Sequence, residues 1–103
     1  MKLRDVAAVI RSKNSGPFEL TFDIIFKDGD LFQRVYEAGV ITRELFAQLY
    51  NLPVENVTAV IGFSPANAIK ATLVRPIPSG ALGERDVYGA QQHVPLFDVE
   101  IQL

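Results

Sequence analysis

The prediction of the fold starts from FELTFDIIF, residues 18–26. Every second residue of this stretch is apolar, namely Phe18, Leu20, Phe22, Ile24 and Phe26. The residues between them are mostly polar, and a repeat of two is the spacing of a β-strand that buries one face. We therefore predict a half-buried strand over residues 18–26, and the other elements are predicted relative to it.

Two helices are predicted after this strand. The turn KDGD (27–30) ends the strand, and Asp30 is the predicted N-cap of a helix over residues 31–38, with Gly39 as its C-terminal stop. Thr42 is the predicted N-cap of a second helix that ends near Tyr50, because a threonine side chain can accept from the free N–H groups of a first helical turn.

Two further strands are predicted over residues 57–63 and 68–75, which carry apolar residues at strand spacing. Asn67 lies in the turn between them, where its tolerance of unusual backbone angles predicts a role in turn geometry. Lys70 alternates onto the polar face of its strand, which predicts a solvated charge.

The ends of the chain are less regular. Residues 3–10 have the spacing of one helical face and fit a short buried strand equally well. RSKNSG (11–16) interrupts this pattern and is predicted to be a polar loop before Pro17. Residues 76–93 are rich in proline and glycine and predict a long loop, and the alternation within residues 95–103 predicts a C-terminal strand.

This order of elements predicts one α+β domain over residues 1–103. Four strands would form a mainly antiparallel sheet with the helices on one face. We expect a ferredoxin-like two-layer sandwich in which the loop over residues 76–93 partly replaces the second helix.

Composition excludes several classes of function. The net charge is -2 and the charges are scattered, which argues against a nucleic-acid or anionic-membrane binder, because such a protein needs a basic face. There is no cysteine and one histidine, which exclude disulfides, thiolate chemistry and a metal site of several imidazoles. No signal peptide or long apolar run is present, so we expect a cytoplasmic protein with neither metal nor cofactor.

Two polar segments are candidate sites. Within RSKNSG, Arg11 and Lys13 are suited to a carboxylate or phosphate, and Ser12 and Asn14 add neutral donors; a solvated turn is the alternative. In the second segment, residues 83–93, the dense hydrogen-bonding groups are Tyr88, Gln91, Gln92 and His93.

His93 is a candidate general acid or base, because histidine is the side chain suited to this role near neutral pH; a structural histidine is the alternative. Near the C-terminus, Asp98 and Glu100 are either a carboxylate pair for a metal or simply the polar face of a strand.

Several motifs, in order, carry a resemblance to a known family: LRDVAAVIRSKNSGPFELTFDI, ITRELFAQLY, PANAIKATLVRPIPSG, DVYGAQQH and PLFDVEI. Together they resemble a small bacterial family of unknown function that accompanies, or is fused to, the acyclic terpene utilisation protein. A weaker likeness extends to the C-terminal ferredoxin-like domain of that protein. The resemblance implies a ferredoxin-like fold and work beside a larger partner. The residues matching the family's polar motifs are Arg11, Ser12, Lys13, Asn14, Tyr88, Gly89, Gln91, Gln92 and His93.

Three functions follow as hypotheses. The first is an accessory subunit of a larger acyclic-terpene-utilisation-type protein, binding a carboxylate or acyl-CoA ligand and not catalytic alone. The second is a free-standing, homodimeric regulatory module that binds a small molecule. The third is an isomerase or lyase that uses His93 as its acid or base.

Overall fold

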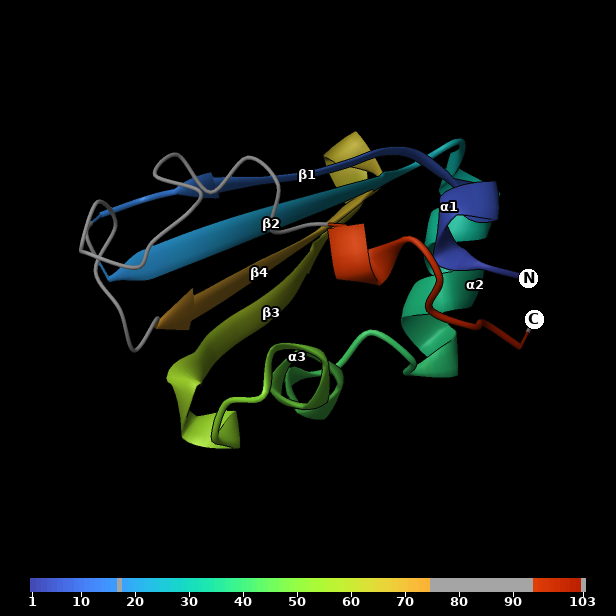
Figure 1. Ribbon diagram of the computed structural model, residues 1–103. Coiled ribbons are helices and arrows are strands. Elements are labelled where there is room, and N and C mark those ends of the chain that lie inside the picture. Colours follow the sequence, from blue (N-terminus) through green and yellow to red (C-terminus); the bar gives the residue numbers. More distant parts are fainter. Residues whose placement is uncertain (17, 75–93, 103) are drawn as a thin grey trace.

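A four-stranded antiparallel sheet forms the centre of the protein (Figure 1). The computed structural model describes residues 1–16, 18–74 and 94–102. The strands are β1 (Ala7–Asn14), β2 (Glu19–Phe26), β3 (Val57–Phe63) and β4 (Ala68–Val74), and their order across the sheet is β1-β2-β4-β3. The predicted α+β class is confirmed, and the arrangement is compatible with a ferredoxin-like sandwich.

Strand β2 is the strand predicted from the alternation of FELTFDIIF. Its buried residues are Leu20, Phe22, Ile24 and Phe26, none more than 2% exposed. These side chains form the inner face of the sheet together with Ile69, Ala71 and Leu73 of β4. The fold therefore depends on a strand whose inner face is completely removed from water.

Helix α2 (Gly29–Ala38) begins two residues earlier than predicted. The carboxylate of Asp28 accepts a hydrogen bond from the backbone N–H of Leu31 at 2.8 Å, so Asp28 is the N-cap. The prediction that Asp30 caps this helix was wrong, because Asp30 already lies within the first turn. The predicted stop is confirmed, since Gly39 has a left-handed backbone conformation with φ of 67°.

Helix α3 (Arg43–Tyr50) has the predicted cap. The hydroxyl of Thr42 accepts from the N–H of Leu45 at 3.1 Å. Both long helices pack on the inner face of the sheet: the ring of Phe46 in α3 lies 5.3 Å from that of Phe22. In α2 the ring of Phe32 lies 6.1 Å from that of Phe26.

The N-terminal segment combines both interpretations that its sequence left open. Helix α1 (Leu3–Val6) is a single turn, and β1 begins directly after it at Ala7. The prediction of a loop over residues 11–16 was wrong for its first four residues, which complete β1. Pairing with β2 satisfies their backbone groups whatever the polarity of their side chains.

The predicted C-terminal strand is absent from residues 94–102. Residues Val94–Leu96 form a 3-10 turn, and Glu100 makes only an isolated antiparallel bridge with Lys2. The strand expected beside β2 in a ferredoxin-like sheet comes from the end of the chain, and here β1 occupies that position. The predicted loop over residues 76–93, and with it the question of a second helix, lies outside the described residues.

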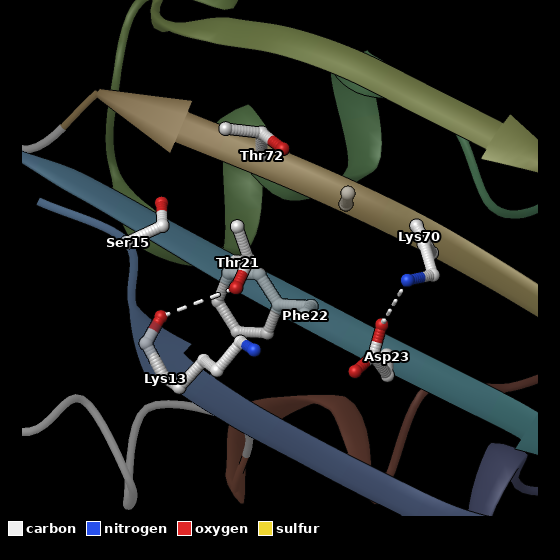
Figure 2. Close-up of a pocket in the computed structure, with 8 residues that line it drawn as sticks. Lys13, Ser15, Thr21, Phe22, Asp23, Lys70 and Thr72 are labelled. Carbon is white, nitrogen blue, oxygen red and sulfur yellow. Dashed lines mark hydrogen bonds and ion pairs between the residues drawn. The ribbon is translucent and has the colours of Figure 1, made fainter.

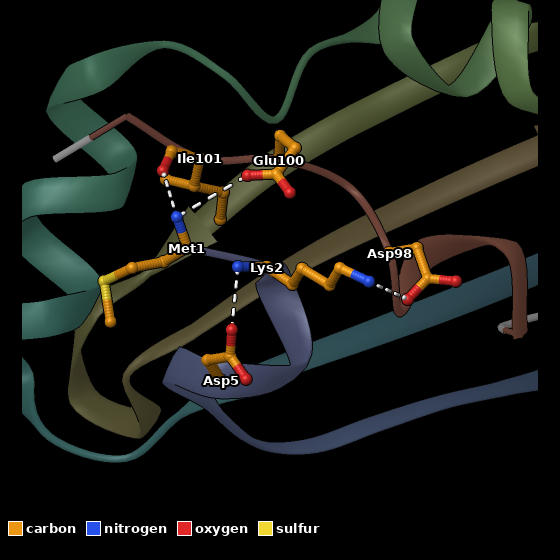
Figure 3. Close-up of polar contacts among 6 residues, drawn as sticks. All are labelled: Met1, Lys2, Asp5, Asp98, Glu100 and Ile101. Atoms are coloured by element: carbon orange, nitrogen blue, oxygen red, sulfur yellow. Dashed lines mark hydrogen bonds and ion pairs between the residues drawn. The ribbon is translucent and has the colours of Figure 1, made fainter.

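The C-terminal segment instead packs against the N-terminus (Figure 3). Leu96 and Ile101 are buried, at 0% and 1% exposure. The backbone N–H of Ile101 donates to the carbonyl of Met1 at 2.7 Å. The described ends of the chain therefore lie side by side over one end of the core.

Candidate functional site

The face of the sheet opposite the helices is open in the described part of the chain (Figure 2). Strand registers align its side chains in three rows that run across all four strands. We call this surface the outer face. In the order β1, β2, β4, β3, the rows are Val9, Ile25, Ala68, Phe63; then Arg11, Asp23, Lys70, Ile61; then Lys13, Thr21, Thr72, Ala59.

The middle row contains a carboxylate between two cations. Arg11 Nε lies 3.0 Å from Asp23 Oδ2, and Lys70 Nζ lies 3.7 Å from Asp23 Oδ1. The Asp23 side chain is 14% exposed, whereas those of Arg11 and Lys70 are 64% and 62% exposed. The cations therefore remain accessible to a further anion while Asp23 is largely covered.

A polar pocket lies beside this row, between β1, β2 and β4. Its volume is about 290 Å³, and the polar side chains that line it are Lys13, Ser15, Thr21, Asp23, Lys70 and Thr72. Thr21 donates its hydroxyl hydrogen to the carbonyl of Lys13 at 3.3 Å. Among the residues the structure describes, the Lys13 ammonium makes no ion pair, and it points to this pocket.

An apolar pocket adjoins the polar one at the β3 corner of the outer face. It has a volume of about 350 Å³ and is lined by Ala59, Ile61 and Phe63 together with Lys70 and Thr72. Ile61 and Phe63 are 60% and 50% exposed, which is unusual for side chains of this size. Lys70 and Thr72 line both pockets, so the two are adjacent.

The strand conformation divides the first predicted site. Arg11 and Lys13 lie in the rows of the outer face, whereas Ser12 pairs with Phe22 and is buried on the inner side. Asn14 is opposite Leu20 and follows the same alternation. Arg11 and Lys13 are thus brought together, apart from Ser12 and Asn14.

The second predicted site lies outside the described residues. Tyr88, Gln91, Gln92 and His93 all belong to the segment 75–93 that the structure does not describe. The binding role of Tyr88, Gln91 and Gln92 and the catalytic role of His93 stay predictions.

Sequence reasoning missed Asp23, Thr21 and Thr72 as members of a candidate site. The alternation of residues 18–26 does put Thr21 and Asp23 on one polar face. The alternation does not show the strand register, and it is the register that sets Asp23 opposite both Arg11 and Lys70. Lys70 is exposed as predicted, but it is paired with Asp23 rather than merely solvated.

The carboxylates near the C-terminus face cations. Asp98 Oδ1 lies 3.3 Å from Lys2 Nζ and 3.5 Å from Arg4 Nη2 (Figure 3). Glu100 lies 3.5 Å from the amino group of Met1. Within residues 1–16, 18–74 and 94–102, no group of three or more metal-ligating side chains is assembled.

The fold and the outer face together define a class: a small α+β sandwich domain with an open sheet face that carries excess positive charge. The chain belongs to the family described as "domain of unknown function (DUF4387)", whose model matches residues 3–100. This confirms the predicted membership of a family of unknown function; its association with acyclic terpene utilisation stays a prediction. No curated protein and no solved structure matches the chain. None of the described helices is long and apolar enough to cross a membrane.

Proposed function

We propose that this chain is an accessory domain whose outer face forms one wall of a binding site for a carboxylate-bearing ligand. The ligand class is a carboxylic acid or its acyl-CoA thioester. A larger partner of the acyclic-terpene-utilisation type forms the opposite wall. The proposal of such a partner is supported by the resemblance of the sequence motifs.

One observation carries the proposal of an anionic ligand. The outer face carries three cations, Arg11, Lys13 and Lys70, against two carboxylates, Asp23 and Glu19. Glu19 lies at the start of β2 and accepts a hydrogen bond from the Ser15 hydroxyl at 3.4 Å. Thr21 and Thr72 place hydroxyl groups beside these cations. Ammonium groups combined with neutral donors are what a carboxylate or phosphate group requires.

The shape of the site supports the role of a partner. Small-molecule sites in proteins usually bury most of the ligand surface. Among the residues that the structure describes, nothing closes the solvent side of either pocket, so these residues alone leave a bound ligand partly exposed. A partner that covers the sheet face would complete the enclosure.

The described part of the site offers little for catalysis. Lys13 and Lys70 are exposed lysines, and the one carboxylate in the pocket, Asp23, is held in ion pairs with Arg11 and Lys70. We therefore expect the pure domain to turn over neither free carboxylic acids nor acyl-CoA thioesters. Measurable turnover by the full chain alone would contradict the accessory role.

Binding is tested by NMR titration of the full chain with acetate and acetyl-CoA. We expect shifts of the backbone amides around Lys13, Thr21 and Thr72, and Lys13→Gln should weaken binding about tenfold. Arg34→Gln is the matched control, because it also removes one exposed cation but on α2. Equal binding by both variants would remove the outer face from the site.

The partner is tested separately by co-expression with an acyclic-terpene-utilisation-type protein. Hydrogen exchange of the complex should slow at β2 and β4, whose outer-face side chains would be covered. A complex that forms without such slowing places the interface elsewhere, and the failure to form any complex contradicts the proposed partner.

A further inference from the structure

We infer that the ligand of the outer face is an amphipathic monocarboxylate with a hydrocarbon chain of about eight carbons. Its head group lies between Lys13 and Lys70, and its chain lies on Ile61 and Phe63. The inference rests on the proposed function, since it takes the polar pocket as the site of the carboxylate. It adds the chemistry of the rest of the ligand and a second part of the site.

The adjacency of the two pockets is the first evidence. The polar pocket, of about 290 Å³, and the apolar pocket, of about 350 Å³, are both lined by Lys70 and Thr72. A ligand with a charged end and an apolar end matches this division.

The composition of β3 is the second evidence. This edge strand, VTAVIGF, contains no charged residue, although edge strands commonly carry charges that discourage association. Two of its outward side chains, Ile61 and Phe63, are among the most exposed large apolar residues described. A contiguous exposed apolar patch with a polar border is typical of a binding surface.

The distance across the sheet sets the length of the chain. A carboxylate between Lys13 on β1 and Lys70 on β4 lies above β2, two strand spacings from β3. Two spacings amount to about 10 Å. An extended carbon chain advances about 1.3 Å per bond, since three backbone bonds span one Cα–Cα separation. About eight carbons therefore reach from the head group to Ile61 and Phe63.

Charge argues against a second copy of this chain as the occupant. The outer face carries three cations and two carboxylates, so two such faces packed together would bring one net positive charge against another. A negatively charged head group, in contrast, is attracted by the cations of the outer face. Self-association through β3 remains one outcome that the experiment detects.

The experiment measures the affinity of the full chain for butanoate, hexanoate, octanoate and decanoate by calorimetry, below the concentrations at which the acids aggregate. We expect affinity to rise about twofold per methylene up to about eight carbons and then level off. Full burial of a methylene group would raise the affinity about fourfold. The outer face covers only part of each methylene group, so the expected gain is smaller. 1-Octanol, which lacks the carboxylate, should bind much more weakly than octanoate.

Variants separate the two parts of the site. Phe63→Ser and Ile61→Ser should abolish the gain from chain length while leaving butanoate affinity unchanged. Lys13→Gln should weaken every acid in the series by the same factor. Val9→Ser is the matched control, because Val9 is a 40% exposed apolar residue of the outer face on the far strand β1. Circular dichroism checks that each variant is folded.

The possible outcomes are distinct. Binding that depends on Lys13 but does not increase with chain length overturns this inference and leaves the proposed function standing. Binding that depends on Phe63 but not on Lys13 overturns the proposed carboxylate site. Absence of binding by every acid overturns both. The last outcome is that Phe63→Ser changes the sedimentation coefficient without changing the affinity for octanoate. That result would show that Ile61 and Phe63 form a contact between copies of the chain, and it would also overturn the inference.

Discussion

The two faces of the sheet differ although they share the same four strands. Ile24 and Ile25 are neighbours in β2, yet Ile24 is 0% exposed under the helices, whereas Ile25 is only half-buried on the outer face. The inner face consists of apolar side chains packed on one another. The outer face carries three cations, two carboxylates, two threonines and an apolar corner. The difference indicates that the inner face provides stability and that the outer face is free to carry function.

The largest expected effect comes from the two adjacent isoleucines. Ile24→Ala should lower the free energy of unfolding by about 2–5 kcal/mol, because it leaves a cavity in a closely packed core. Ile25→Ala should cost less than about half as much, because solvent can fill the space on the open side. Urea denaturation of both variants measures this, and equal losses would mean that the outer face is covered too.

Tyr50 provides a pH-dependent test of the inner face. Its ring packs 5.1 Å from that of Phe22, and burial raises the pKa of the Tyr50 phenol. The unfolded chain loses this proton near pH 10, whereas the folded protein keeps it to higher pH. The contribution of the protonated Tyr50 phenol to the free energy of unfolding is therefore complete below pH 10. It decreases as the pH rises above 10, by up to about 1.4 kcal/mol per pH unit.

Tyr50→Phe removes this dependence, so the stability difference between the two proteins should change with pH only above about pH 10. Urea denaturation of both proteins between pH 8 and pH 11 measures this difference. The lysines are the same in both proteins, so they do not contribute to the difference. Parallel stability curves would show that the hydroxyl is accessible to water.

Asp23→Asn tests the balance of charge on the outer face. The variant weakens the ion pairs with Arg11 and Lys70, and its cost in stability should be at most about 1 kcal/mol, because both cations are mostly exposed. Its affinity for acetate should increase severalfold, because the cations then lack their internal anion. Reduced affinity would instead mean that Asp23 orients the cations for the ligand.

The smallest expected effect on stability is that of Lys13→Gln. The Lys13 ammonium has no ion pair within the described residues, so the variant should change the free energy of unfolding by less than about 0.5 kcal/mol. The same variant is expected to bind carboxylates about tenfold more weakly. Thermal unfolding recorded with and without octanoate measures both, and a clearly destabilised variant would assign Lys13 a structural role.

Elements with strong local signals were predictable. The alternation of residues 18–26 and the side-chain cap of Thr42 depend on neighbours within one element. The turn residue Asn67 was likewise predicted, and its backbone has the left-handed conformation, with φ of 52°. The cap at Asp30 was missed by two positions because Asp28 and Asp30 are equally suitable by residue type.

The fourth strand of the sheet was not predictable from pattern. Residues 95–103 alternate more clearly than residues 7–14, which contain Arg11 and Lys13. The polar segment nevertheless became β1, because its position beside β2 lets Arg11 pair with Asp23 while the backbone completes the sheet. Leu96 and Ile101 are buried without forming a strand, so alternation there reflects burial rather than pairing.

The amino-acid order alone was enough for the α+β class, the inner face of β2, the two long helices and the cationic character of residues 11–13. Each of these depends on the residue types within one segment. The tertiary structure decided which segment pairs with β2, and it brought Lys13, Asp23 and Lys70 to one face. Register and strand order depend on contacts between residues far apart in the chain, and the energy of those contacts exists only once the sheet has formed.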